Sequence, residues 1–179
     1  LKLFLKLYKE IVNQFKMEDW QMPEQIQYMD LFAKFDKNPF EMSGEDADNF
    51  FKKEIRPTII NPTIILDYPA HMSPLAARKK DDNRFVEQWQ LIIQGWEIVK
   101  CYTELTDPNL QKDLLEEQMK LKDSGQEEIA ELEQDFLECM EYGMPPQSGL
   151  GIGLDRLLAL LVGKENLKDV VFFPTMNKE

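Results

Sequence analysis

Apolar residues recur with a helical period at the start of the chain. Six apolar residues recur at helical spacing over residues 1–15: Leu1, Leu5, Tyr8, Ile11, Val12 and Phe15. This spacing predicts an amphipathic helix whose apolar side faces a core. A basic helix lying on a membrane surface is the alternative. Glu10 and the excess of acidic residues in the chain argue against it.

The next residues predict two more helices separated by a polar loop. A second helix is expected over about 24–35, and residues 36–44 are typical of a loop. Ser43 can cap a third helix over 43–55, because its side chain can accept a backbone N–H. Acidic residues follow in the first turn, where the helix dipole favours them.

The pattern then changes to short apolar runs typical of strands. Residues 62–68 form a β-branched run bounded by prolines. The runs 84–93 and 96–105 meet at Gln94-Gly95, a dipeptide suited to a tight hairpin turn. The apolar residues 169–173 predict a further short, buried strand.

Three helices complete the predicted elements. Asp107 can cap a helix that starts at Pro108 and ends at Ser124-Gly125. An acidic helix follows over about 126–141, and another helix over about 154–163. An antiparallel sheet from the second half of the chain, flanked by helices from both halves, makes an α+β fold.

A glycine-rich strand precedes the last helix. Gly149, Gly151 and Gly153 stand two apart, so they leave one face of the strand without side chains. Each glycine in a strand destabilises it by about 0.5–1 kcal/mol relative to alanine, and such a glycine often marks the close approach of a backbone or a ligand. A flat aromatic ring can lie on the bare face, with Arg156 stacked over it and in reach of a phosphate. The alternative is a packing strand followed by a surface arginine.

Composition narrows the class of protein. The 179 residues suit one domain, and a formal net charge of −12 argues against a general nucleic-acid-binding surface. A nucleic acid held by another domain or a local patch stays compatible with it. No segment reaches the ~20 apolar residues that span a bilayer. Cys101 and Cys139 match neither a metal site nor a disulfide framework, which favours the cytoplasm. The chain begins with Leu-Lys rather than Met, so we expect a piece of a longer protein.

The stretch G-L-G-I-G-L-D-R-L resembles the third signature motif of class II aminoacyl-tRNA synthetases. Four more stretches resemble, in order and spacing, the C-terminal part of a lysyl-tRNA synthetase catalytic domain: N-P-T-I-I-L-D-Y-P-A-H-M-S-P-L-A, E-I-V-K-C-Y-T-E-L-T-D-P, D-F-L-E-C-M-E-Y-G-M-P-P and K-D-V-V-F-F-P-T-M. The resemblance covers about residues 45–177 and implies part of a class II synthetase-like core over 45–179. Residues 1–44 form a helical segment that matches poorly.

The resemblance implies ATP-dependent activation of lysine and its transfer to tRNA(Lys), with ATP and Mg²⁺ as cofactors. The three strand glycines and Arg156 would hold ATP, and Glu97 would hold a magnesium ion that bridges the ATP phosphates. In this reaction the lysine carboxylate attacks the α-phosphate and pyrophosphate leaves. The metal and the arginine neutralise the growing negative charge.

The resemblance also implies that Glu104 and Tyr102 select the amino acid. Related enzymes for aspartate carry an arginine at the position of Glu104, so a glutamate there suits the ammonium group of lysine and penalises a neutral analogue. Tyr102 resembles the family aromatic residue that packs along the lysine stem. The alternative for Glu97 and Glu104 is a solvated strand face.

Two residues depart from the family pattern. Gln90 stands where a second metal-binding glutamate is usual, and Lys100 stands where an asparagine usually contacts the substrate. A neutral amide oxygen can still bind a cation or accept a hydrogen bond from its bound water, but one negative charge is lost. Lys100 would repel the substrate lysine unless its ammonium group pairs with Glu104 or Glu97 in the empty site. Otherwise it can reach the substrate carboxylate or a phosphate.

The spacing of the two glutamates raises a geometric question. Glu97 and Glu104 are seven residues apart, so a regular strand would put them on opposite faces. If both line one pocket, a bulge near Ile98-Val99 must lie between them.

Three parts of such an enzyme are not visible in the sequence. They are the first motif with its dimer-interface helix, the second motif with its phosphate-binding arginine, and the anticodon-binding barrel. We therefore expect no measurable aminoacylation by this chain alone. For the full-length protein we expect a homodimer, with lysine, ATP and tRNA as ligands and no membrane. Two alternatives stay open: a non-catalytic synthetase-like interaction module, favoured by Lys100 and Gln90, and a paralogous ligase that transfers lysine to a protein.

Overall fold

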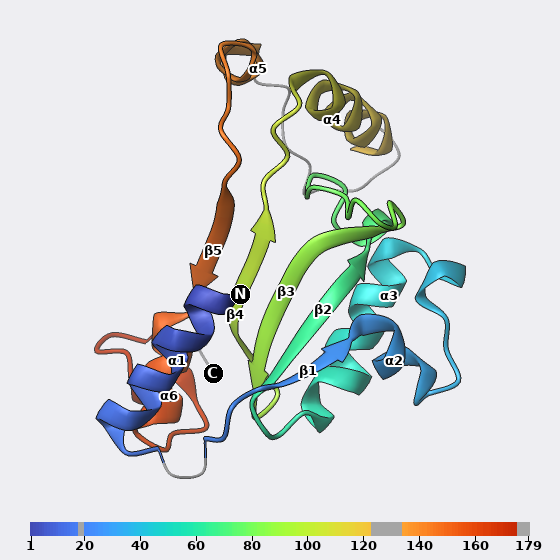
Figure 1. Ribbon diagram of the computed structural model, residues 1–179. Coiled ribbons are helices and arrows are strands. Elements are labelled where there is room, and N and C mark those ends of the chain that lie inside the picture. The colour runs from blue at the N-terminus through green and yellow to red at the C-terminus, as the bar shows by residue number, and fades with distance from the viewer. Residues whose placement is uncertain (18–19, 123–133, 175–179) are drawn as a thin grey trace.

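The structure is a five-stranded sheet with helices on both faces (Figure 1). The computed structural model describes residues 1–17, 20–122 and 134–174. The strands are β1 Glu24–Gln27, β2 Thr63–Pro69, β3 Phe85–Ile93, β4 Trp96–Thr103 and β5 Ser148–Ile152. The helices are α1 Lys2–Phe15, α2 Tyr28–Ala33, α3 Gly44–Phe50, α4 Pro108–Lys122, α5 Gln134–Glu141 and α6 Leu154–Leu161.

The strands lie side by side in chain order, from β1 to β5. β1 runs parallel to β2, and the other neighbours are antiparallel. The β3–β4 hairpin turns at Gln94 and Gly95, where φ is 50° and 73°. Two positive φ values in a two-residue turn match the twist of the flanking strands. The predicted α+β fold and its hairpin are confirmed.

Each face of the sheet carries its own apolar core. On the α2/α3 face, Ile65, Val86 and Ile92 pack against the aromatic and aliphatic side chains of α2 and α3 and the turn that follows α3. On the opposite α1/α6 face, Trp89 and Leu91 pack against the side chains of α1 and α6. Figure 1 shows α2 and α3 at the β1–β2 end of the sheet and α1 and α6 at the β5 end.

Several predicted elements are confirmed with their caps. The helix α1 is confirmed, and Tyr8 of its predicted apolar side packs with Phe4 into the core of the α1/α6 face. Leu1 and Phe15, expected on the same side, are 38% and 56% exposed. Ser43 Oγ accepts the Asp46 N–H at 3.0 Å at the start of α3. Asp107 Oδ1 accepts the Asn109 N–H at 2.9 Å at the start of α4. The predicted end of α4 at 124–125 and the first residues of the following helix lie outside the described residues.

Two predicted elements are wrong. Residues 24–27 form a strand, not the start of a helix, because they pair with β2 from Thr63 to Leu66; α2 is correspondingly short. Residues 169–173 form no strand, and Phe172 and Phe173 are 96% and 94% exposed. An apolar run alone does not decide between a strand and an exposed segment when no partner strand lies beside it.

Candidate functional site

A β-bulge puts Glu97 on the same face of β4 as Glu104. The register of β3 against β4 shifts between Leu91 and Ile92, which leaves Ile98 as an extra residue. Ile92 lies opposite Glu97 and points into the core of the α2/α3 face, and cross-strand partners share a face. The bulge therefore lies where the spacing of the two glutamates predicted it.

The other expected site residues follow on the same α2/α3 face, beyond the helices that cover it. Lys100 lies opposite Gln90 on one side and Gly151 on the other, and Tyr102 lies opposite Gly149. The side chains of Glu97, Lys100, Tyr102 and Glu104 are all half-buried. The register thus brings the expected residues together on one face.

The Glu97 carboxylate also affects the aromatic core below this face. Tyr68 lies fully within that core, and burial raises the pKa of its hydroxyl well above the ordinary value. The negative charge of Glu97 adds to this increase, together with Tyr28 and Asp48, while Arg56 opposes it. Glu97 is therefore close enough to the α2/α3 core for its charge to raise the pKa of the Tyr68 hydroxyl.

The three glycines of the strand, here called the glycine strip, have three different surroundings. A Cβ at Gly149 would collide with the carboxylate of Glu104 and lie 3.3 Å from the Tyr102 ring. A Cβ at Gly153 would lie 3.3 Å from Arg156 Cδ. A Cβ at Gly151 would meet only the backbone carbonyl of Lys100, at 3.9 Å. The middle of the strip is therefore open, with an acid and an aromatic ring at one end and the aliphatic stem of Arg156 at the other.

Arg156 is held at this position by the backbone of β4. Its Nη1 donates a hydrogen bond to the carbonyl oxygen of Glu97 at 2.8 Å. The side chain starts in the first turn of α6 and leans over Gly153. The rest of the guanidinium keeps its donors for a ligand on the strip.

The charged side chains of this face are not paired with one another. Within the described part of the chain, Lys100, Glu97 and Glu104 form no ion pair within 4.0 Å. The expectation that Lys100 pairs with a glutamate of the empty site is therefore wrong for this structure. A half-buried charge without a partner is costly unless a ligand supplies one.

Two glutamines complete the face. Gln90 is 6% exposed and Gln88 is 3% exposed. Gln90 Oε1 and both polar atoms of the Gln88 side chain are buried without a hydrogen-bond partner. Gln88 lies opposite Tyr102 and is an addition to the expected site. Its signal is in the sequence, because Gln88 and Gln90 stand two apart in an otherwise apolar run and so share a face.

Comparison with known proteins identifies the family of the chain. Residues 2–177 match the family model for tRNA synthetases class II (D, K and N). The chain belongs to this class II synthetase family. Over 136 residues, 76% of this chain, it is 43% identical to a lysine–tRNA ligase of Christiangramia forsetii and 40% identical to one of Latilactobacillus sakei. It spans only 24% and 27% of those two proteins, or about a quarter of their length.

A magnesium ion fits the donor set of this class II synthetase chain. Mg²⁺ is usually held by one or two carboxylates together with substrate phosphates and water. Glu97 supplies a carboxylate. Gln90 supplies a buried amide oxygen that has no hydrogen-bond partner among the described residues. Gln90 lies on the neighbouring strand β3, two residues before the residue that pairs with Glu97. The described residues contain no group of three His, Cys, Asp or Glu side chains suited to a metal. The two donors therefore fit an ion held mainly by phosphates.

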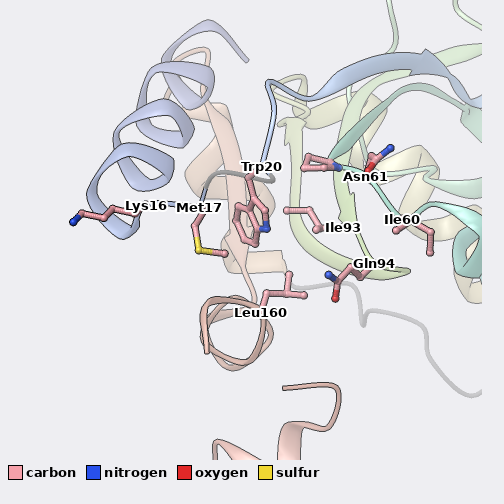
Figure 2. A pocket seen from close by; sticks show the side chains of 9 residues that line it. Lys16, Met17, Trp20, Ile60, Asn61, Ile93, Gln94 and Leu160 are labelled. Atoms are coloured by element: carbon pink, nitrogen blue, oxygen red, sulfur yellow. The ribbon is translucent and has the colours of Figure 1, made fainter. Parts of the chain in front are cut away.

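Two hollows lie on the opposite, α1/α6 face of the synthetase chain. One, of about 540 Å³, lies between the end of α1, the hairpin turn and α6, and Figure 2 shows Trp20, Ile93 and Leu160 around it. The other, of about 600 Å³, lies between α1 and the sheet, beside Trp89 and Leu150. Neither hollow is lined by Glu97, Glu104 or Arg156, but Gln88 and Tyr102 of the candidate site border the second one.

Among the described helices of the synthetase chain, none combines the length and the apolar character needed to cross a membrane.

Proposed function

We propose that the chain is the ATP- and lysine-binding part of a lysine–tRNA ligase, which activates lysine with ATP and transfers it to tRNA. The observation that carries the proposal is the Glu104 carboxylate. It is half-buried, has no cation partner within the described residues, and packs with Tyr102 over Gly149. A carboxylate beside an aromatic ring suits a ligand with an apolar stem and an ammonium tip.

The remaining residues of the face suit ATP. The base can lie against the bare strip on the side of Gly153, next to Arg156, which leaves the open space over Gly151 to a phosphate. Arg156, fixed through Glu97, can stack on the base or donate to a phosphate. Glu97 and Gln90 would hold a magnesium ion, which supplies charge neutralisation for the phosphates.

The reaction then requires the carboxylate of the bound lysine to lie next to the α-phosphate of the bound ATP. A lysine bound by Glu104 and Tyr102 directs its carboxylate toward the nucleotide over Gly151. A carboxylate oxygen forms the new bond to the α-phosphorus, and the bond to pyrophosphate breaks. The arginine stabilises the negative charge that builds on the phosphate oxygens. Transfer of the lysyl group to tRNA would use the longer protein that the relatives represent.

The proposal is tested by comparing lysine with norleucine, which has the same stem without the ammonium group. We expect wild-type chain to bind lysine about a hundredfold more tightly, since an unpaired buried carboxylate strongly disfavours the neutral analogue. Glu104→Gln should remove the preference. Glu87→Gln is the matched control, because Glu87 is exposed on the opposite face of β3. Equal affinity for the two ligands in the wild type, measured by amide shift changes in NMR titrations, would contradict the proposal.

A non-catalytic paralogue is the second candidate, and Gln90 and Lys100 favour it. Together they replace one carboxylate by a neutral amide and add one positive charge to the face. Lysine-dependent exchange of pyrophosphate into ATP separates the two candidates in the full-length protein. Exchange supports the ligase, and binding of both ligands without exchange supports the paralogue.

A further inference from the structure

Lys100 is the cation at the centre of the candidate site. It projects from β4 on the α2/α3 face, directly opposite Gly151 on β5 and Gln90 on β3. It forms no ion pair with any described residue, although its side chain is half-buried. Its ammonium group is therefore left without a carboxylate partner among the described residues.

The space beside Lys100 is open and is bordered by hydrogen-bond donors. A side chain at Gly151 would meet nothing but the Lys100 carbonyl oxygen within 4 Å. The Gln90 side chain, opposite Lys100 on β3, carries an amide N–H₂ group. On the other side, the aliphatic stem of Arg156 lies against Gly153, and its guanidinium donates to the Glu97 carbonyl oxygen. Nitrogen donors around a strip without side chains favour an anion with several oxygens.

The Glu104 carboxylate leaves this space to Lys100. It lies beside Gly149 and the Tyr102 ring, at one end of the glycine strip. Glu104 follows directly after β4, four residues beyond Lys100, which corresponds to roughly 13 Å along a strand. At that separation the Lys100 ammonium group interacts only weakly with a second ammonium bound at Glu104, because salt screens exposed charges over about 10 Å.

We propose that Lys100, assisted by Gln90, binds an oxyanion of the substrates over Gly151. The oxyanion is a phosphate of ATP or the carboxylate of lysine. This inference rests on the proposed function and deepens it, because it divides the face into an ammonium end at Glu104 and an oxyanion centre at Lys100. Lys100 then attracts the reacting end of the substrates instead of repelling lysine.

The test follows the Gly151 amide in NMR spectra of the chain, with pyrophosphate as the probe. Pyrophosphate should shift this amide in the wild type and in Lys100→Arg, which keeps the charge. Lys100→Asn should weaken the affinity about tenfold or more. Lys112→Asn is the matched control, since it removes one positive charge from the exposed surface of α4. Dispersed spectra establish that each variant is folded.

Two pairs of ligands identify the source of the oxyanion. ATP is compared with adenosine, and lysine with lysinamide, which lacks the carboxylate. Lys100→Asn should weaken the binding of the member of one pair that carries the oxyanion, and it should leave the binding of the member that lacks this group unchanged. If pyrophosphate fails to shift Gly151 in the wild type, or if Lys100→Asn behaves like Lys112→Asn, the proposal is wrong. The proposal is also wrong if Lys100→Asn changes neither the affinity for ATP nor the affinity for lysine.

The same spectra keep this inference separate from the proposed function. Lysinamide should shift Gly149, beside Glu104, whether or not Lys100 is present. A response at Gly149 without one at Gly151 leaves the lysine site standing and overturns the role of Lys100. A response to ATP at Gly151 without one to lysinamide at Gly149 supports Lys100 and overturns the lysine site.

Discussion

In β2 and β3 nearly every side chain is covered on both faces of the sheet, whereas β5 is open. Ile65 and Ile92 are 0% exposed. On β5, Leu150 and Ile152 are 48% and 36% exposed, and the other face carries glycines. One end of the sheet is therefore built for packing, and the other end keeps a surface free of side chains.

The difference indicates where this protein gives up stability for binding. The covered end uses apolar side chains in two cores, which is how most of the stability of a small domain arises. Near the open end, Lys100, Glu97 and Glu104 form no ion pair with one another or with any other described residue. Buried polar atoms without partners among the described residues occur in both regions, at Gln88 and Gln90 and at Tyr28 and Tyr68 in the α2/α3 core. The open end therefore differs from the covered end by its bare glycines and its unpaired charges.

The largest expected contrast is in stability between the two ends. Ile92→Ala should lower the free energy of unfolding by about 2–5 kcal/mol, because it leaves a cavity in the α2/α3 core. Ile152→Ala should lower it by less than about 1 kcal/mol, since that side chain is already in contact with solvent. Urea denaturation of the two variants measures both values. Similar losses would show that the two ends are equally packed.

A second contrast lies within the glycine strip. Gly149→Ala should displace the Glu104 carboxylate and lower the stability by about 1 kcal/mol. The variant should also lose the preference for lysine over norleucine. Gly151→Ala should change stability by less than about 0.5 kcal/mol, because its Cβ meets only a carbonyl oxygen at 3.9 Å.

Ligand titrations of the two alanine variants complete this comparison. Gly151→Ala should weaken the binding of ATP more than the binding of lysinamide. Gly149→Ala should weaken the binding of lysinamide more than that of ATP. Identical ligand profiles for both variants would mean that the strip is a single site and not two.

Much of this arrangement could be predicted from the sequence. Alternating apolar runs and Gln94-Gly95 predict the hairpin, and the seven-residue spacing of Glu97 and Glu104 predicts the bulge. The strand β1 could not be predicted in the same way, because its four residues E-Q-I-Q have no clear period and their partner strand is far along the chain. Tertiary pairing decides such a segment.

The candidate site was predictable in its residue types but not in its contacts. The glycines and Arg156 stand out by spacing alone. The lack of a partner for Lys100 depends on side-chain positions across three strands, which no local pattern encodes.

The last expected effect concerns Gln88, one of the buried polar residues in the covered part of the sheet. Its amide oxygen and nitrogen are both buried without a partner. Gln88→Met should therefore stabilise the ligand-free chain by about 1 kcal/mol, since it removes the penalty of two unsatisfied groups while keeping a similar volume. Urea denaturation measures the gain, and Gln111→Met, at a buried position on α4, serves as the control.

The ligand response of the same variant decides why a glutamine stands there. If Gln88 completes its hydrogen bonds with a ligand beside Tyr102, Gln88→Met should bind lysinamide several-fold more weakly while being more stable. A more stable variant with unchanged binding would mean that Gln88 serves no ligand, and that the boundary between the covered and open ends lies nearer to Tyr102 than to Gln88.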